Sequence, residues 1–131
     1  METFHKSERL CSRKAITSLF EAGNSFYTPL YKIVWSETSS PVESPAQAAF
    51  SVSKKGFRKA TERNLVRRRM REAYRKNKQT LYDHLAELGI RINFIIIFRE
   101  NRIPDYGTIE KSMIEMIGRL CLEMSVKQSK R

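Results

Sequence analysis

The stretch "RINFIIIF", residues 91–98, decides the fold of this 131-residue chain. Its apolar residues follow one another almost without interruption, whereas a strand with one wet face alternates apolar and polar residues. The stretch therefore predicts a central β-strand that is buried on both faces. The remaining segments have to supply a cover for each face.

A short helix and two or three strands are expected before the central strand. Residues 12–22 have a helical pattern, with Ser12 placed to cap the helix and Gly23 placed to end it. Residues 25–35 are aromatic and β-branched but contain a proline, which predicts two short strands or one kinked edge strand. Strand character resumes at residues 48–53.

One helix is expected before the central strand in the sequence and another after it. A basic helix is predicted to continue to about His84, and apolar residues at helical spacing predict another helix from about residue 108 to 124. The order is then helix, two or three strands, long helix, strand, helix. This order predicts an α+β sandwich.

One domain is expected to span residues 1–131, since the chain is 40% hydrophobic and 30% charged. Its core is predicted to cover about residues 7–124. Serine and proline dominate residues 36–46, which predicts a flexible loop between strands. The polar end of the chain predicts a frayed tail over residues 125–131.

Positive charge is concentrated in one segment. The whole chain has a net charge of +11, from 25 Lys and Arg against 14 Asp and Glu. Residues 54–76 hold eleven of these cations with only two glutamates, whereas the other 108 residues hold fourteen cations and twelve carboxylates. A focused excess of this kind is the electrostatic footprint of a protein that binds nucleic acid or an acidic membrane.

The basic helix is predicted to be amphipathic. On a helical wheel, one sector holds its apolar residues: Val66, Met70, Ala73 and Tyr74, extended by Leu81. The opposite sector holds Asn64, Arg67, Arg68, Arg71 and Arg75. A merely solvated face would mix the two signs of charge, whereas here Glu72 offsets only Arg68 or Arg75. Planar guanidinium groups also suit phosphate contacts better than ammonium groups do.

RNA is favoured over DNA by the setting of this helix. DNA readers of the major groove are more often all-helical, whereas RNA-binding modules combine a sheet, exposed aromatic residues and basic residues. Six aromatic residues lie in the first helix and the early strands: Phe20, Phe26, Tyr27, Tyr31, Trp35 and Phe50. Taken one at a time, each is expected in the core, and the pattern leaves open which face of the sheet is exposed.

The motifs around the basic helix resemble those of the protein subunit of bacterial ribonuclease P. "SVSKK" (51–55) precedes "RNLVRRRMREAYR" (63–75), and an apolar strand that ends in Arg99 follows. "RL" (9–10) with Ile16, Phe20 and Gly23 is similar to the first helix of that family. The resemblance covers roughly residues 7–122.

Two departures from the family pattern concern individual contacts. Leu65 stands where the motif has its second arginine, so one RNA contact is expected to be missing, and Arg69 is a candidate to replace it in part. The link "GFRKATE" (56–62) is one residue longer than is usual in the family.

The resemblance implies an α+β fold of order αβββαβα, with a four-stranded mixed sheet and the basic helix in a left-handed crossover. Such crossovers are rare exceptions to the right-handed rule. It also implies an accessory protein rather than a catalyst. The catalytic RNA subunit performs a Mg²⁺-dependent hydrolysis that removes the 5′ leader of precursor tRNA, and the RNA holds the Mg²⁺. The protein binds that RNA and the single-stranded leader, with no small-molecule substrate and no membrane partner.

Candidate site residues follow from the charge pattern and from the resemblance. The predicted RNA-binding residues are Lys54, Lys55, Arg58, Arg63, Asn64, Arg67, Arg68, Arg71 and Arg75. The predicted residues of the leader cleft are Ile16 and Phe20, with Val34 or Trp35 as a weaker candidate.

Two other functions stay open on the sequence alone: a structural ribosomal RNA-binding protein, and a protein nuclease that acts without RNA. No HxH, HExxH, GxSxG or P-loop pattern is present, and His5 and His84 are isolated. The scattered carboxylates name no candidate for a protein active site. A nuclease of this kind is therefore the weakest of the three hypotheses.

A cytoplasmic location is expected. Cys11 and Cys121 are far apart in the sequence, which favours a reducing compartment over a disulfide-bonded scaffold. The first residues lack the apolar core of a secretory signal, and "FIIIF" (94–98) is too short to cross a bilayer.

Overall fold

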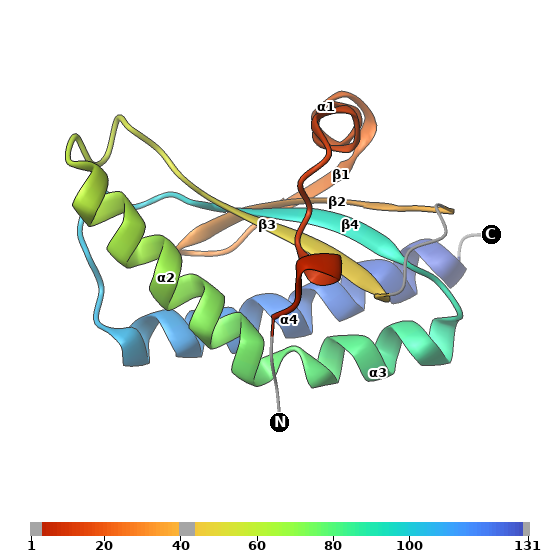
Figure 1. The fold of residues 1–131 in the computed structure, drawn as a ribbon. Helices are drawn as coiled ribbons and strands as arrows, with labels where there is room; N and C mark the ends of the chain where they lie inside the picture. The colour runs from red at the N-terminus through yellow and green to blue at the C-terminus, as the bar shows by residue number, and fades with distance from the viewer. Residues whose placement is uncertain (1–3, 40–43, 130–131) are drawn as a thin grey trace.

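Four strands and four α-helices are found in the computed structural model, which describes residues 4–39 and 44–129 (Figure 1). In chain order the elements are η1 (Lys6–Glu8), α1 (Arg13–Ala22), β1 (Asn24–Tyr27), β2 (Tyr31–Glu37), β3 (Ala46–Val52), α2 (Ala60–Asn77), α3 (Gln79–Leu88), β4 (Ile92–Phe98) and α4 (Tyr106–Ser129). The predicted α+β order is confirmed, and of the two alternatives for residues 25–35 the structure has two separate strands.

β4 is a central strand, as its sequence predicts. The sheet has the order β1-β2-β4-β3. Ile95 of β4 lies opposite Val34 of the antiparallel neighbour β2 and opposite Ala49 of the parallel neighbour β3. β1 extends the sheet by pairing antiparallel with β2. The "RINFIIIF" stretch therefore contributes a full row of backbone hydrogen bonds on each side.

Successive side chains of β4 enter two different cores. Phe94 and Ile96 are fully buried in the larger core, which α2, α3 and α4 close on one face of the sheet (Figure 1). Ile95 lies on the other face, in a small core with Val34 and Leu19 of α1. Burying one side chain of this size contributes roughly 1.5–3 kcal/mol. The apolar run of β4 is therefore explained by helices on both faces, three on one and α1 alone on the other.

The connection between the parallel strands β3 and β4 is a left-handed crossover. In Figure 1 both strands run from right to left, β3 lies in front of β4, and α2 and α3 pass beneath the sheet between them. This is the sense that the family resemblance implies, and it is an exception to the strong right-handed rule.

The predicted long helix is divided into α2 and α3, and that prediction is wrong in this respect. The division follows Asn77, whose side-chain amide donates to the carbonyl oxygen of Ala73 at 2.8 Å. A side chain that competes for the carbonyl four residues earlier disturbs the backbone ladder and bends a helix. Figure 1 shows the change of direction between α2 and α3.

A buried ion pair fastens the N-terminal segment at this bend. Lys78 donates to Glu8, and both side chains are more than nine-tenths buried. The hydroxyl of Tyr82 donates to the same carboxylate oxygen at 2.5 Å, and the backbone N–H of His5 donates to the other oxygen at 2.7 Å. Burial alone would raise the pKa of the Glu8 carboxyl, but these donors outweigh burial and hold the pKa below its ordinary value.

Two predicted boundaries are corrected by the structure. Ser36 and Glu37 belong to β2, so the predicted loop 36–46 is shorter, and residues 40–43 lie outside the described residues. Residues 125–129 of the predicted frayed tail 125–131 are instead helical, because α4 continues to Ser129, and residues 130–131 lie outside the described residues. Met124 is fully buried there and Gln128 donates to Glu37, so the last turns of α4 have tertiary partners that local sequence does not reveal.

Gly23 is expected to tolerate no larger residue, because it ends α1 against the sheet. A Cβ at this position would lie 2.4 Å from the carbonyl oxygen of Leu19 and 2.9 Å from Cγ1 of Val34. Gly23→Ala should lower the free energy of unfolding by about 1–3 kcal/mol in urea titrations. The matched control is Gly118→Ala on α4, where a Cβ meets nothing within 4 Å and should stabilise the helix by about 0.5–1 kcal/mol. Equal effects of the two substitutions would contradict this account of Gly23.

Candidate nucleic-acid interface

α2 presents one buried face and one exposed basic face, as predicted. Val66 and Met70 are fully buried against the sheet and α4. Asn64, Arg68 and Arg71, on the opposite side of the helix, are exposed. The described residues give Arg68 and Arg71 no ion pair or side-chain hydrogen bond, so their guanidinium groups are available to an external anion.

Other predicted cations have partners within the protein. Arg63 donates to the carbonyl oxygens of Phe57 at 2.7 Å and Arg58 at 3.1 Å, which ties the preceding loop to the first turn of α2. Arg75 pairs with Glu72 at 2.6 Å, and this hydrogen bond lowers the pKa of the Glu72 carboxyl. Of the two partners expected for Glu72, the structure selects Arg75.

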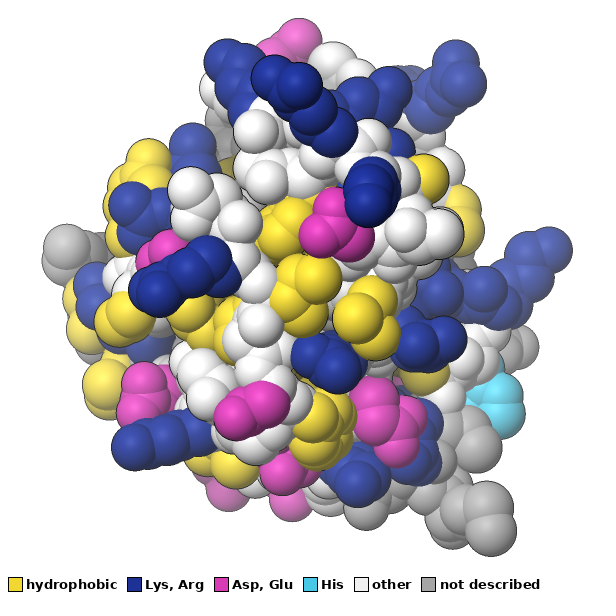
Figure 2. All heavy atoms as spheres, turned by 90° about the vertical axis from the view of Figure 1, so that its left-hand side faces the viewer, with side chains coloured by type: hydrophobic (Ala, Val, Ile, Leu, Met, Phe, Trp, Pro, Cys, Tyr) yellow, Lys and Arg dark blue, Asp and Glu magenta, His cyan; other side chains and the backbone are white. Residues whose placement is uncertain are grey.

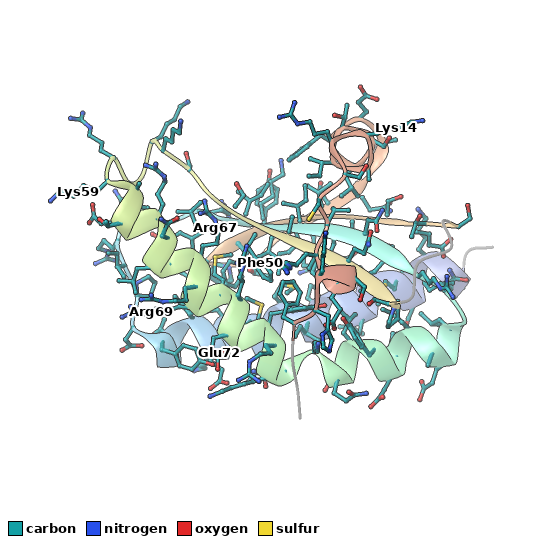
Figure 3. All side chains as sticks on the ribbon, viewed as in Figure 1. Lys14, Phe50, Lys59, Arg67, Arg69 and Glu72 are labelled. Carbon is teal, nitrogen blue, oxygen red and sulfur yellow. The ribbon has the colours of Figure 1, made fainter. Side chains whose placement is uncertain are left out.

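Arg67 and Arg69 leave α2 on different sides (Figure 3). Arg67 lies on the side toward β3 and donates to the side-chain oxygen of Asn64 at 2.9 Å, a contact between two exposed groups. Arg69 donates to the carbonyl oxygen of Pro104 at 2.7 Å and so holds the segment that leads into α4. Arg69 is thus already bound to another part of the protein, on a different side of α2 from Arg67. This argues against Arg69 making the RNA contact of the family arginine that Leu65 replaces.

The loop from Ser53 to Lys59 adds four exposed cations beside the start of α2: Lys54, Lys55, Arg58 and Lys59. The loop is anchored by Phe57, which is buried and stacks on Phe98 with ring centroids 6.1 Å apart. Figure 2, which faces this end of the molecule, shows Lys and Arg side chains gathered over its upper part. In Figure 3, Lys59 extends away from the body of the protein at the first turn of α2. We give the name basic end to seven cations of this loop and of the first part of α2: Lys54, Lys55, Arg58, Lys59, Arg67, Arg68 and Arg71.

The predicted cleft residues divide between the two faces of the sheet. Ile16 is half-buried against the small core under α1, Val34 is buried in that core, and Phe20 is 57% exposed. Trp35 is 2% exposed and belongs to the larger core on the opposite face. Its assignment to a cleft beside α1 is therefore wrong, because neighbouring residues of a strand point to opposite faces.

Two exposed aromatic residues mark the open face. Among the six noted in the sequence, Phe20 and Tyr27 are exposed, at 57% and 53%, whereas the other four are core residues. The sheet face on which α1 sits also carries half-buried Ile97 and exposed Ser51, beyond the residues that α1 covers. Sequence periodicity could not predict which face of the sheet stays exposed, because it does not say which face the three helices cover.

The described part of the chain contains no cluster of side chains that could bind a metal ion. Across residues 4–39 and 44–129, no group of three or more His, Cys, Asp and Glu side chains is placed to hold a metal ion. His84 contacts the Ser125 hydroxyl at 2.8 Å. In the same residues, no helix has the length and apolar character needed to cross a membrane.

Comparison with known proteins identifies relatives over nearly the whole chain. The family model described as Ribonuclease P matches residues 4–121. A ribonuclease P protein component from Porphyromonas gingivalis is 36% identical over 115 residues, which covers 88% of this chain and 84% of the relative. Another from Chlorobium phaeobacteroides is 40% identical over 132 residues, covering 93% and 90%.

Solved structures with the same fold are also ribonuclease P proteins. The Staphylococcus aureus RNase P protein superposes with a TM-score of 0.69 at 19% identity, over 88% of this chain and 95% of that one. The Thermotoga maritima protein gives a TM-score of 0.68 at 21% identity, over 86% and 96%. The mixed four-stranded sheet with four helices is therefore the fold of these proteins.

Proposed function

Because the chain belongs to the ribonuclease P protein family, we propose that it is the RNA-binding subunit that assists a catalytic RNA in removing the 5′ leader of precursor tRNA. The observation that carries this proposal is the basic end, where exposed cations from a loop and a helix stand together without carboxylate partners among the described residues. Such a cluster can bind an anionic partner with closely spaced negative charges, and the phosphates of an RNA backbone have this spacing.

The two parts of the basic end have complementary roles in the proposal. Arg68 and Arg71 lie on a rigid helix one turn apart, so they contact phosphates at a fixed spacing. The loop cations before α2 contact the RNA backbone where it enters from the edge of the sheet. Such contacts fix orientation and carry no base specificity by themselves. Specificity for leader-containing substrates would come instead from the open sheet face beside α1, where exposed aromatic groups suit unstacked bases.

Catalysis is assigned to the RNA in this proposal, together with the Mg²⁺ that the family resemblance implies. Phosphates of the RNA would hold the ions, and the Mg²⁺ would activate water for hydrolysis of the phosphodiester bond. The side chains of this protein bind and orient. Their positive charge also lowers the cost of bringing the phosphates of catalyst and substrate together. We place this activity in the cytoplasm, as expected from the two unpaired cysteines.

Reconstitution tests the proposal directly. Adding the protein to its cognate RNase P RNA, at low Mg²⁺ and physiological salt, should accelerate leader cleavage by at least tenfold, which is ~1.4 kcal/mol of barrier. Cleavage is followed on end-labelled precursor tRNA in single-turnover reactions. The control is RNA-free protein, which should not cleave. Unchanged cleavage on adding protein, or co-sedimentation of the protein with ribosomes in place of this RNA, would contradict the proposal.

A further inference from the structure

Tyr27, the last residue of β1, is an exposed aromatic residue with two cations beside its ring. The guanidinium carbon of Arg99 lies 4.6 Å from the ring centroid, and the ammonium nitrogen of Lys32 lies 5.6 Å from it. The side chain is 53% exposed, whereas its neighbour Phe26 is 5% exposed in the larger core. The large ring of Tyr27 is thus exposed at the surface, and two positive charges lie close to it.

The position of Tyr27 connects it to the open sheet face. Strand register places Tyr27 beside Lys32, Lys32 beside Ile97, and Ile97 beside Ser51. These four residues form one row across the sheet, on the face that carries α1. Ser51 at one end of the row precedes the basic loop, and Tyr27 stands at the other end. Three strand spacings separate the two ends, a distance of ~14 Å.

Arg99 is held beside the ring by the backbone of the β1–β2 turn. Its backbone N–H donates to the carbonyl oxygen of Leu30 at 2.8 Å, and its guanidinium donates to that of Thr28 at 3.1 Å. The turn is already closed by the Thr28 N–H, which donates to the Tyr31 carbonyl oxygen at 2.8 Å. The exposed ring of Tyr27 is therefore not needed to brace the turn. The fixed guanidinium adds a planar, positively charged surface to the aromatic one.

We propose that Tyr27, Arg99 and Lys32 form a stacking site for one nucleotide of the single-stranded 5′ leader, at the β1 edge of the sheet and across the row from Ser51. The inference rests on the proposed function, since it names where on this protein the leader continues. The base stacks on the Tyr27 ring or on the Arg99 guanidinium, and Lys32 and Arg99 contact the adjoining phosphates. Stacking of this kind accepts any base, because every base has a π-face.

The length of the row sets which leader nucleotides reach the site. At ~3.4 Å per stacked nucleotide, crossing ~14 Å takes about four nucleotides. A leader of two nucleotides is then too short to reach Tyr27, whereas a leader of ten nucleotides is long enough. The site therefore discriminates by leader length and not by base identity.

The test measures binding of both precursor tRNAs to the reconstituted holoenzyme, in Ca²⁺ to prevent cleavage. Tyr27→Leu should weaken binding of the long-leader substrate by about tenfold and leave binding of the short-leader substrate within twofold. Tyr27→Phe keeps the ring and should stay within twofold of wild type on both substrates. Leu122→Ala, at an exposed apolar position of α4, is the matched control and should change neither.

The outcomes separate this inference from the proposed function. If the wild-type holoenzyme binds both substrates equally, leader binding by the protein is itself wrong. If wild type prefers the long leader and Tyr27→Leu keeps that preference, the leader is bound elsewhere and the Tyr27 site is wrong. An equal loss on both substrates would assign Tyr27 a structural role and also overturn the site.

Discussion

Replacing Lys78 with alanine is expected to lower the free energy of unfolding by about 3–5 kcal/mol, because the substitution leaves the Glu8 carboxylate buried without its cationic partner. Both side chains are less than one-tenth exposed, so water does not take the place of the missing ammonium group. The pair joins the N-terminal segment to the bend between α2 and α3. Chemical denaturation of wild type and variant, followed by circular dichroism, measures the loss of stability.

The contribution of Glu8 should also depend on pH in a defined direction. The folded-state pKa of its carboxyl is lowered, so the unfolded chain binds the proton more readily than the folded protein. The stabilisation is therefore fully present above the ordinary pKa of a glutamate and is lost as the pH falls through the lowered folded-state pKa. In Lys78→Ala this acid-side loss should shrink, because Lys78 is one of the donors that lower the pKa.

Two further variants serve as controls. The double substitution Glu8→Gln with Lys78→Met removes both charges and should recover part of the stability, since the cost comes from an unpaired buried charge. Glu123→Ala breaks the solvent-exposed pair with Arg119 on α4 and should cost less than about 1 kcal/mol. A Lys78→Ala effect as small as that of Glu123→Ala would show that the buried pair does not hold the N-terminal segment.

Neutralising the three arginines that α2 contributes to the basic end should produce the largest loss of function. The triple variant Arg67→Ala, Arg68→Ala, Arg71→Ala is expected to bind the RNase P RNA about 10³-fold more weakly, at roughly tenfold for each arginine–phosphate interaction removed. The slope of log affinity against log salt should fall by about 0.7–0.9 for each such interaction, which is a sharper signature than affinity alone. Filter binding across a salt series gives both quantities.

The matched control for this variant removes the same charge elsewhere. Arg91, Lys111 and Arg119 are exposed and lie outside the basic end, so their triple alanine variant has the same net charge. It should retain most of the affinity. The stability of the α2 variant should be nearly unchanged or slightly raised, because repulsion between neighbouring arginines is relieved. Equal losses in the two triple variants would mean that net charge, and not this surface, drives binding.

Several features of the protein follow from short windows of its sequence. The uninterrupted apolar run of "RINFIIIF" requires burial on both faces, which makes β4 a central strand in the structure. The spacing of Val66, Met70 and Tyr74 defines the buried side of α2 and leaves Arg68 and Arg71 on the opposite side. Ser12 and Gly23 set the ends of α1 through bonds to residues three or four positions away. Such features are predictable because the interacting groups are neighbours in the chain.

Other features were decided by contacts between residues far apart in sequence. Strand alternation separates Val34 from Trp35, but only the positions of the helices determine that α1 covers Val34 and that Trp35 enters the larger core. Among the arginines, Arg69 is engaged by Pro104, 35 residues away, which no helical wheel reveals. Glu8 and Lys78 meet across 70 residues at the bend after α2.

The physical reason for this division is the range of the interactions. Periodicity, capping and i,i+3 or i,i+4 pairs act within a few turns, so the sequence itself determined that this protein has a central buried strand and an arginine-bearing helix. Which face stays open, and which cations stay free for RNA, depends on the order in which strands and helices are packed. Only the tertiary structure placed Arg99 and Lys32 beside the exposed ring of Tyr27 on that open face.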